Sequence, residues 1–292
     1  MQLSEQGSFP LTVAGKMRAG EYALAGNVSS QFISGLLMAL PKAEGDSLLR
    51  ITGSIQSRPY IQMTLEMLET FGVHAEDRGD SFRIPGNSVF QSPGRLRVEG
   101  DWSGAAFWLA AGALSEAGVV LGGLNPDSAQ GDRAMLDLVR QFGAETAVRG
   151  DELTVRKGRL RGIRIDAANI PDLVPALAVV AAAAEGETRI CRISRLRLKE
   201  SDRVQSVLAL LHTLGVAAEA DEDEMRIQGR AAWKGGVIDS FRDHRIVMAA
   251  AVAGSAARET LEITGAEAVS KSYPGFFEQF RALGGRAKEV QT

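Results

Sequence analysis

An α/β fold made of repeated βαβαββ units is predicted by two features of this 292-residue sequence. The first is a set of four similar helix endings, in which an apolar residue is followed by a glycine. The glycines are Gly72, Gly143, Gly215 and Gly284, separated by 71, 72 and 69 residues. The second is an alanine-rich apolar segment upstream of each glycine, which indicates a buried helix. A period of about 70 residues is too long for a solenoid repeat and fits a small unit copied four times.

The elements of each copy are expected in a fixed order. Buried helices that begin with Ser, Ser, Pro and Asp, all suited to a helix start, are expected at 29–40, 103–114, 171–184 and 243–256. Strands are expected to follow at 47–52, 118–121, 188–193 and 260–263. An amphipathic helix then runs to each glycine, which we expect to end it in the left-handed conformation. A hairpin such as 73–76 with 82–84 completes each unit, except in the fourth copy, where a single short strand is expected.

Two domains joined by a linker are expected from the positions of Pro and Gly along the chain. Gln91-Ser92-Pro93-Gly94 is the best linker candidate, because Pro and Gly concentrate there. It divides residues 8–93, a single βαβαββ unit, from residues 94–292, a domain of three units. A lone unit exposes apolar faces and strand edges, so we expect a further polypeptide or self-association to cover it.

Composition excludes several classes of protein. With 33 basic and 36 acidic residues and 6% aromatics, a nucleic-acid-binding surface is not expected. The single cysteine, Cys191, excludes an intramolecular disulfide, and the three histidines lack metal-ligand spacing, so neither a metal nor a cofactor is expected. No uncharged apolar run reaches membrane-spanning length, and residues 1–7 lack the pattern of a signal peptide. We therefore expect a cytoplasmic protein without a membrane partner.

The segment from Arg195 to Arg203 has the most informative charge pattern. It places Arg and Lys beside Glu and Asp at the start of an apolar-periodic helix. A helix N-terminus already favours anions, so Lys199 and Arg203 would make a site for phosphate or carboxylate, with Glu200 inside it as a proton carrier. These nine residues alone are equally compatible with a capped, solvated helix start.

Motifs spread over all four copies point to a known family. In chain order they are Gly26-Asn27-Val28-Ser29-Ser30-Gln31-Phe32, Ser57-Arg58-Pro59-Tyr60, Val98-Glu99-Gly100-Asp101, Ile170-Pro171-Asp172, Lys199-Glu200-Ser201-Asp202-Arg203, Asp243-His244-Arg245 and Lys271-Ser272-Tyr273-Pro274. Together they closely resemble the EPSP synthase family, from about residue 11 onward. The resemblance implies two domains of three βαβαββ units each, closing around the substrates. Four of the six units would be present, with the N-terminal part of the first domain missing.

The resemblance also implies a reaction. The family transfers the enolpyruvyl (1-carboxyvinyl) group of phosphoenolpyruvate to the 5-hydroxyl of shikimate 3-phosphate, a step of the shikimate pathway toward chorismate and the aromatic amino acids. Both substrates are anions with two or more charges, so clustered Lys and Arg are required. Protons must be added to the enol methylene and removed from the attacking hydroxyl, so at least two acid–base groups are required.

Each site residue is assigned by this resemblance. Shikimate 3-phosphate would contact Ser29, Ser30, Gln31, Ser57, Asp172 and Lys199. Phosphoenolpyruvate would contact Gln31, Arg203, His244, Arg245 and Lys271. Asp172 would orient or deprotonate the attacking hydroxyl, and Glu200 would protonate the enol carbon, with Lys199 and Arg203 keeping it anionic until needed.

Simpler roles remain open for several of these residues. Ser29 and Asp172 suit helix caps, and His244 suits an orienting or packing role. Tyr60 is expected to pack, and Ser57 taken alone is an ordinary residue before a helix. Arg195 stands where some family members have a substrate-contacting Asn, so either this loop binds through charge or the local alignment is loose.

Two alternative functions remain. The related UDP-N-acetylglucosamine 1-carboxyvinyltransferases use a reactive loop cysteine, whereas Cys191 lies in a predicted strand. The other alternative is a non-catalytic or split-enzyme fragment that only binds substrates. We expect this chain to need the missing N-terminal part for turnover, because one wall of the closed site would be absent.

Overall fold

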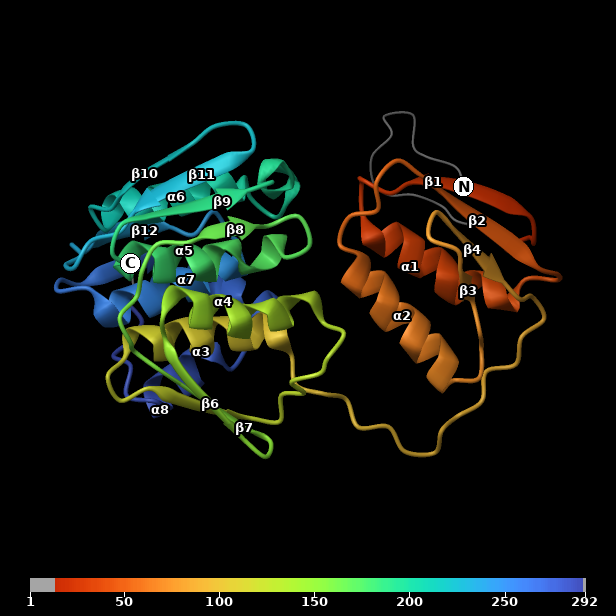
Figure 1. Ribbon diagram of the computed structural model, residues 1–292, viewed down its shortest axis with the longest axis horizontal. Helices are drawn as coiled ribbons and strands as arrows, with labels where there is room; N and C mark the ends of the chain where they lie inside the picture. The colour runs from red at the N-terminus through yellow and green to blue at the C-terminus, as the bar shows by residue number, and fades with distance from the viewer. Residues whose placement is uncertain (1–13, 291–292) are drawn as a thin grey trace. The chain divides into compact units, whose positions relative to one another are not determined.

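The computed structural model describes residues 14–290, which fall into two compact units divided between Arg97 and Val98 (Figure 1). We call the described residues on either side of this division unit 1 and unit 2. The predicted linker, 91–94, lies within an irregular segment between Ile84 and Trp102. The predicted domain boundary at 93/94 lies four residues before the observed division.

Unit 1 is one βαβαββ unit. Its elements are β1 (Glu21–Ala25), α1 (Ser30–Ala39), a 3₁₀ turn η1 (Leu40–Lys42), β2 (Ser47–Thr52), α2 (Arg58–Thr70), β3 (Glu76–Asp77) and β4 (Ser81–Ile84). The sheet has the order β1-β2-β4-β3, in which β1 and β2 are parallel and the other pairs antiparallel. Because β1 and β2 run the same way, the loops that lead into α1 and α2 leave the same edge of the sheet.

Helix α1 has two apolar faces. Ile33 and Leu37 are fully buried in the core of unit 1, together with apolar side chains of β2 and β4. Phe32 and Met38, in contrast, are 57% and 56% exposed. Exposed apolar side chains, which are expected of a lone unit, are therefore present on two sides of α1.

Unit 2 contains the remaining helices and strands of the described chain. In order they are α3 (Trp102–Leu114), β5 (Val119–Gly122), η2 (Gly131–Arg133), α4 (Ala134–Phe142), β6 (Glu145–Arg149), β7 (Glu152–Arg156), β8 (Arg164–Asp166), η3 (Pro171–Leu173), α5 (Val174–Ala183), β9 (Glu187–Cys191), η4 (Ser194–Leu198), α6 (Arg203–Thr213), β10 (Ala217–Ala220), β11 (Glu224–Gln228), β12 (Gly236–Asp239), α7 (His244–Ala256), β13 (Leu261–Thr264), η5 (Ala266–Lys271) and α8 (Phe276–Ala282).

One sheet of unit 2, β8-β9-β11-β10, repeats the strand order of unit 1. The other two are incomplete versions of it, β5-β7-β6 and the parallel pair β12-β13. Within residues 14–290 no strand precedes α3 in its copy. No strand follows α8 within these residues either, so the predicted short strand after Gly284 is wrong. The segment before α3 is exposed, and near its end the Gly100 amide donates a 3.0 Å hydrogen bond to the Gly123 carbonyl.

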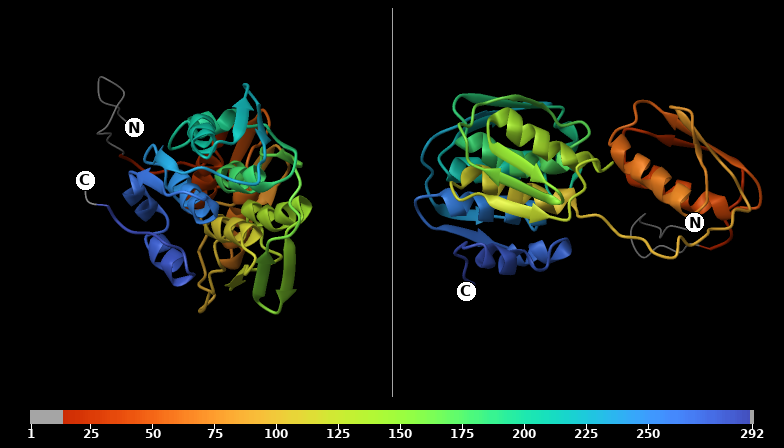
Figure 2. Two further views of the ribbon diagram at one scale, coloured as in Figure 1. Left: turned by 90° about the vertical axis from the view of Figure 1, so that its left-hand side faces the viewer. Right: turned by 60° about the horizontal axis from the view of Figure 1, so that its bottom comes forward.

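The first helices of the three copies form the centre of unit 2. Helices α3, α5 and α7 contact one another, and strands of the sheets lie on the outside of the bundle (Figures 1 and 2). Their buried residues are mostly alanine, valine and leucine, whose small size lets the helices approach closely. The prediction of buried first helices is thus confirmed for unit 2. Across residues 14–290 the structure contains no helix long and apolar enough to cross a membrane.

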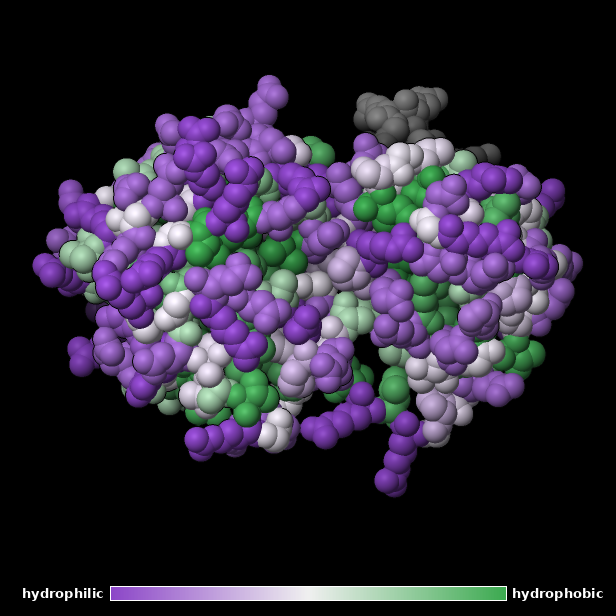
Figure 3. Space-filling model, viewed as in Figure 1, coloured by the Kyte–Doolittle hydropathy of each residue, from purple (hydrophilic) through white to green (hydrophobic). Residues whose placement is uncertain are grey.

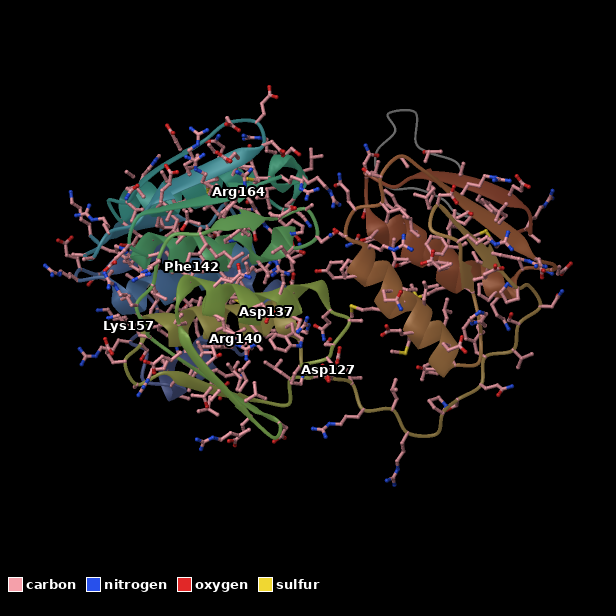
Figure 4. All side chains as sticks on the ribbon, in the orientation of Figure 1. Asp127, Asp137, Arg140, Phe142, Lys157 and Arg164 are labelled. Atoms are coloured by element: carbon pink, nitrogen blue, oxygen red, sulfur yellow. The ribbon has the colours of Figure 1, made fainter. Side chains whose placement is uncertain are left out.

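The second helices are amphipathic, as predicted. In α4, Asp137 and Arg140 pair at 3.4 Å on the exposed face, whereas Phe142 is fully buried (Figure 4). Hydrophilic side chains dominate much of the face of unit 2 that Figure 3 shows, with apolar patches between them.

The helix ends follow the glycine prediction closely. Gly72, Gly143, Gly215 and Gly284 all have a left-handed backbone, with φ of 78°, 105°, 74° and 92°. The predicted starts of two helices need correction. The first is α3, which is capped by Asp101 through the amides of Ser103 and Gly104, because a carboxylate two residues earlier already satisfies those donors.

The other start to correct is that of α5. The proline that was expected to begin this helix opens the preceding turn, η3. Ser29 and Asp243 cap α1 and α7 as predicted.

Candidate active site

A buried arginine, Arg203, lies at the centre of a charged cluster in unit 2. It is the first residue of α6 and only 1% exposed. Its Nε donates to Asp243 Oδ2 at 2.7 Å, and its Nη1 donates to Asp172 Oδ1 at 2.6 Å. Its Nη2 donates to Glu200 Oε2 at 2.8 Å and to Asp243 Oδ1 at 3.3 Å. The Arg203 guanidinium therefore donates most of its N–H groups to three carboxylates.

Two of these carboxylates, Asp172 and Glu200, lie in the same copy of the repeat as Arg203, and Asp243 comes from the next copy. Asp172 lies in η3, immediately before α5, and Asp243 caps α7. Glu200 lies between η4 and α6, not inside a helix, so the helix predicted from the charge pattern begins three residues later than Glu200. Asp243 also accepts hydrogen bonds from the Arg245 amide (2.9 Å) and the Ser201 hydroxyl (3.1 Å).

Three further cations surround the same carboxylates. Lys199 Nζ is 3.2 Å from Asp172 Oδ1. Arg245 lies with its Nε 3.8 Å from that oxygen, and its Nη1 donates to the Asp172 carbonyl at 3.2 Å. Lys271, at the end of η5, places Nζ 2.8 Å from Glu200 Oε1. Arginine and lysine from two neighbouring copies of the repeat thus converge on one place.

These cations keep two carboxyl groups ionised. Burial raises the pKa of Glu200, but the hydrogen bond from Lys271 and the charge of Arg203 outweigh it and lower the pKa to about 2. Burial also opposes ionisation of Asp172, yet Arg245, Lys199 and Arg203 hold its pKa far below its ordinary value. Arg203 contacts Glu200 as predicted, but the predicted Lys199 pairs with Asp172, and Lys271 takes its place beside Glu200.

His244 packs beside the cluster as the first residue of α7. It is buried, and its Nδ1 is 3.8 Å from Asp243 Oδ1 without a hydrogen-bond partner among the described residues. Burial and the charge of Arg245 lower its pKa, so the ring is neutral at pH 7. The geometry is compatible with both the packing role and the substrate contact.

Four predicted residues, Ser29, Ser30, Gln31 and Ser57, lie in unit 1. Ser29 caps α1 by accepting from the Gln31 amide at 3.2 Å, Ser30 is buried and Gln31 is exposed. Ser57 is buried at the start of α2 with a left-handed backbone (φ 54°), an unusual conformation for serine that is frequent at functional sites.

The two helix starts of unit 1 lie at one edge of its sheet. The Gln56 amide donates to the Gly26 carbonyl at 3.1 Å, which ties the loop before α2 to the residues before α1. The structure therefore brings the four unit 1 residues to one edge. The cluster around Arg203 belongs to unit 2.

Two other residues were singled out from the sequence. Burial lowers the pKa of Arg195, in η4, while the charge of Asp172 opposes that shift, so Arg195 adds positive charge near the cluster. Tyr60 lies in the first turn of α2 and is half-buried, in line with the packing role.

Sequence reasoning missed two buried carboxylates of this region. Asp243 was recognised as a helix start but not as a partner of Arg203, because forty residues separate them. Asp132, in η2, is 1% exposed; its Oδ2 accepts from the Ser103 hydroxyl, and its Oδ1 has no partner among residues 14–290. Burial raises the pKa of Asp132 to about 6, against the opposing hydrogen bond from Ser103 and charge of Arg245.

Replacing Asp132 with asparagine is expected to stabilise unit 2 at neutral pH. The unfolded chain loses this proton near its ordinary pKa of 3.8 and the folded chain near 6, so folding loses about 3 kcal/mol as pH rises through that window. Asp132→Asn should therefore gain up to about 3 kcal/mol at pH 7.5 and almost nothing at pH 4. Urea unfolding at both pH values measures the difference; an equal effect at both would contradict it.

Comparisons with known proteins identify this fold. The structure matches EPSP synthase from Acinetobacter baumannii with a TM-score of 0.80 and 28% identity, covering 99% of this chain and 68% of that one. The enolpyruvyl transferase NikO from Streptomyces tendae matches with a TM-score of 0.78 at 20% identity, which bears on the fold alone. The architecture is that of the enolpyruvyl transferases.

Sequence comparison narrows this class. The family model of EPSP synthase (3-phosphoshikimate 1-carboxyvinyltransferase) matches residues 1–280. Proteins named 3-phosphoshikimate 1-carboxyvinyltransferase from Clostridium kluyveri and Methanocella arvoryzae are each 43% identical to the chain, over 98% and 97% of it. The chain belongs to the EPSP synthase family. It spans 63–67% of the length of the first three curated relatives.

Proposed function

We propose that this protein transfers the enolpyruvyl group of phosphoenolpyruvate to the 5-hydroxyl of shikimate 3-phosphate. The observation that supports this most is the convergence of Lys199, Arg203, Arg245 and Lys271 on the carboxylates Asp172 and Glu200. Such a cluster can bind a phosphate and a carboxylate while presenting two acid–base groups.

The two carboxylates take different roles. Glu200 pairs with Lys271, a proposed ligand of phosphoenolpyruvate, and so lies where the enol methylene would be protonated. Asp172 pairs with Lys199, a proposed ligand of shikimate 3-phosphate, and so lies where the attacking hydroxyl would be oriented. Ser29, Ser30, Gln31 and Ser57 would add contacts to shikimate 3-phosphate from helix starts, which favour anions.

Cys191 offers no support for UDP-N-acetylglucosamine as the acceptor. It ends β9, and its thiol donates to Glu224 Oε2 at 3.2 Å. Burial and that carboxylate raise the pKa of the thiol, which disfavours the reactive thiolate. Protection against thermal unfolding by shikimate 3-phosphate, and not by UDP-N-acetylglucosamine, is the expected result.

Phosphate release tests the proposal directly. The 292-residue chain is assayed with both substrates, alone and together with the third of the Clostridium kluyveri relative that it does not cover. Phosphate release that requires both substrates is expected in at least one arm. Substrate binding without release in either arm would instead favour the binding-only fragment, and neither binding nor release would refute the proposal.

A further inference from the structure

The charges of the cluster do not balance those of phosphoenolpyruvate. Five cations, Lys199, Arg203, Arg245, Lys271 and the nearby Arg195, face three carboxylates, Asp172, Glu200 and Asp243. The sum is +2, or +1 while the neighbouring Asp132 is also ionised, whereas the carboxylate and phosphate of phosphoenolpyruvate together carry roughly −3 at neutral pH. An unmatched charge in a partly buried site is costly, so binding favours the gain of one proton.

Glu200 is the carboxylate whose partners can leave most easily. Its side chain is 32% exposed, and that of Lys271 is 57% exposed, so Lys271 can turn toward an incoming anion at little cost. Asp243, in contrast, is fully buried and is also held by a hydroxyl and a backbone amide that no ligand can displace. Asp172 is less exposed than Glu200 and is shared by three cations.

We propose that Lys271 is an electrostatic latch on Glu200. Phosphoenolpyruvate draws the ammonium group of Lys271 away from Glu200, and the freed carboxylate takes one proton from water or buffer to become a carboxylic acid. This inference rests on the proposed function, because it takes phosphoenolpyruvate as the anion. Its consequence is that Glu200 holds a transferable proton only while the substrate that needs it is bound.

The groups that face Glu200 are compatible with this exchange. Lys271 approaches from η5, Arg203 from α6 and His244 from α7. Arg203 remains in place, because Asp172 and Asp243 also hold it, and its charge is divided among three carboxylates. Burial lowers the pKa of His244, which weakens it as a competitor of Glu200 for that proton.

Carboxyl-carbon NMR of the ¹³C-glutamate-labelled chain measures the protonation of Glu200. The Glu200 signal is identified by its loss in Glu200→Gln, and its titration midpoint is followed with and without millimolar phosphoenolpyruvate. We expect the midpoint to rise from the acidic range of the free protein to about pH 6 or above, because one cation leaves and an anion arrives and because only a midpoint near neutral pH leaves Glu200 protonated in the complex. In Lys271→Gln the midpoint should already be raised in the free protein, and phosphoenolpyruvate should raise it less.

Glu116 provides the matched control. It forms an ion pair with Lys157 at 2.8 Å, the same separation as Glu200 and Lys271, but in a different part of unit 2. Its signal should not respond to phosphoenolpyruvate, nor should the Glu200 signal respond to Lys157→Gln.

The outcomes separate this inference from the proposed function. Phosphate release with an unmoved Glu200 midpoint would overturn the latch and leave the function intact. A raised midpoint without turnover would support the latch and count against catalysis. A Glu200 signal unchanged because phosphoenolpyruvate does not bind, together with no phosphate release, would overturn both.

Discussion

Replacing Arg203 with methionine is expected to lower the free energy of unfolding of unit 2 by about 3–5 kcal/mol, because it leaves buried carboxylates without their cation. Asp243 is fully buried and receives two of the guanidinium bonds, so its charge cannot be met by water. Arg203→Lys keeps the charge but loses the planar guanidinium group that reaches three carboxylates. Its free energy of unfolding should therefore lie between those of Arg203→Met and the wild type.

Tryptophan fluorescence during urea unfolding measures this effect in unit 2 alone. All three tryptophans, Trp102, Trp108 and Trp233, lie in unit 2. Arg140→Met is the control, because it removes an exposed ion pair with Asp137 and should cost at most about 1 kcal/mol. Similar losses for both variants would show that the cluster contributes nothing beyond a surface pair.

The repeat was predictable because local chemistry specifies it. Gly72, Gly143, Gly215 and Gly284 end helices in a conformation that glycine adopts without steric cost, so their spacing reveals the copied unit. The apolar helices between them follow from composition alone. Pairing of strands is non-local, so the sequence did not show that, within residues 14–290, β5 would have only β7 as a strand neighbour.

The site was only partly predictable from the residues. Lys199, Glu200 and Arg203 are close in sequence, so their common site can be inferred from charge spacing. Asp243 and Lys271 reach the same place because their copy packs beside that of Arg203, and Asp172 is brought there by the fold of the copy that it shares with Arg203; a local pattern cannot show either. Asp132 is missed for the same reason, and its burial between η2 and α3 is a tertiary property.

Replacing Asp172 with asparagine is expected to lower the turnover number by about 10²–10⁴-fold, in the assay in which the wild type releases phosphate. In the free protein, Arg245, Lys199 and Arg203 hold the pKa of Asp172 far below its ordinary value, so it is a weak base there. The pKa of Asp172 must rise when the substrate anions pair with some of those cations, which makes Asp172 a stronger base. Asparagine accepts a hydrogen bond but cannot take the proton.

The two kinetic constants distinguish a catalytic Asp172 from a binding residue. KM should change little, because the cations that meet both anions remain in Asp172→Asn, and the loss should therefore lie in kcat. Asp166→Asn is the control, since Asp166 is an exposed carboxylate of β8 that pairs with Arg192. Unfolding followed by fluorescence shows that each variant is folded at the assay temperature. A raised KM with an unchanged kcat would make Asp172 a ligand of shikimate 3-phosphate, and the proton of the attacking hydroxyl would need another acceptor.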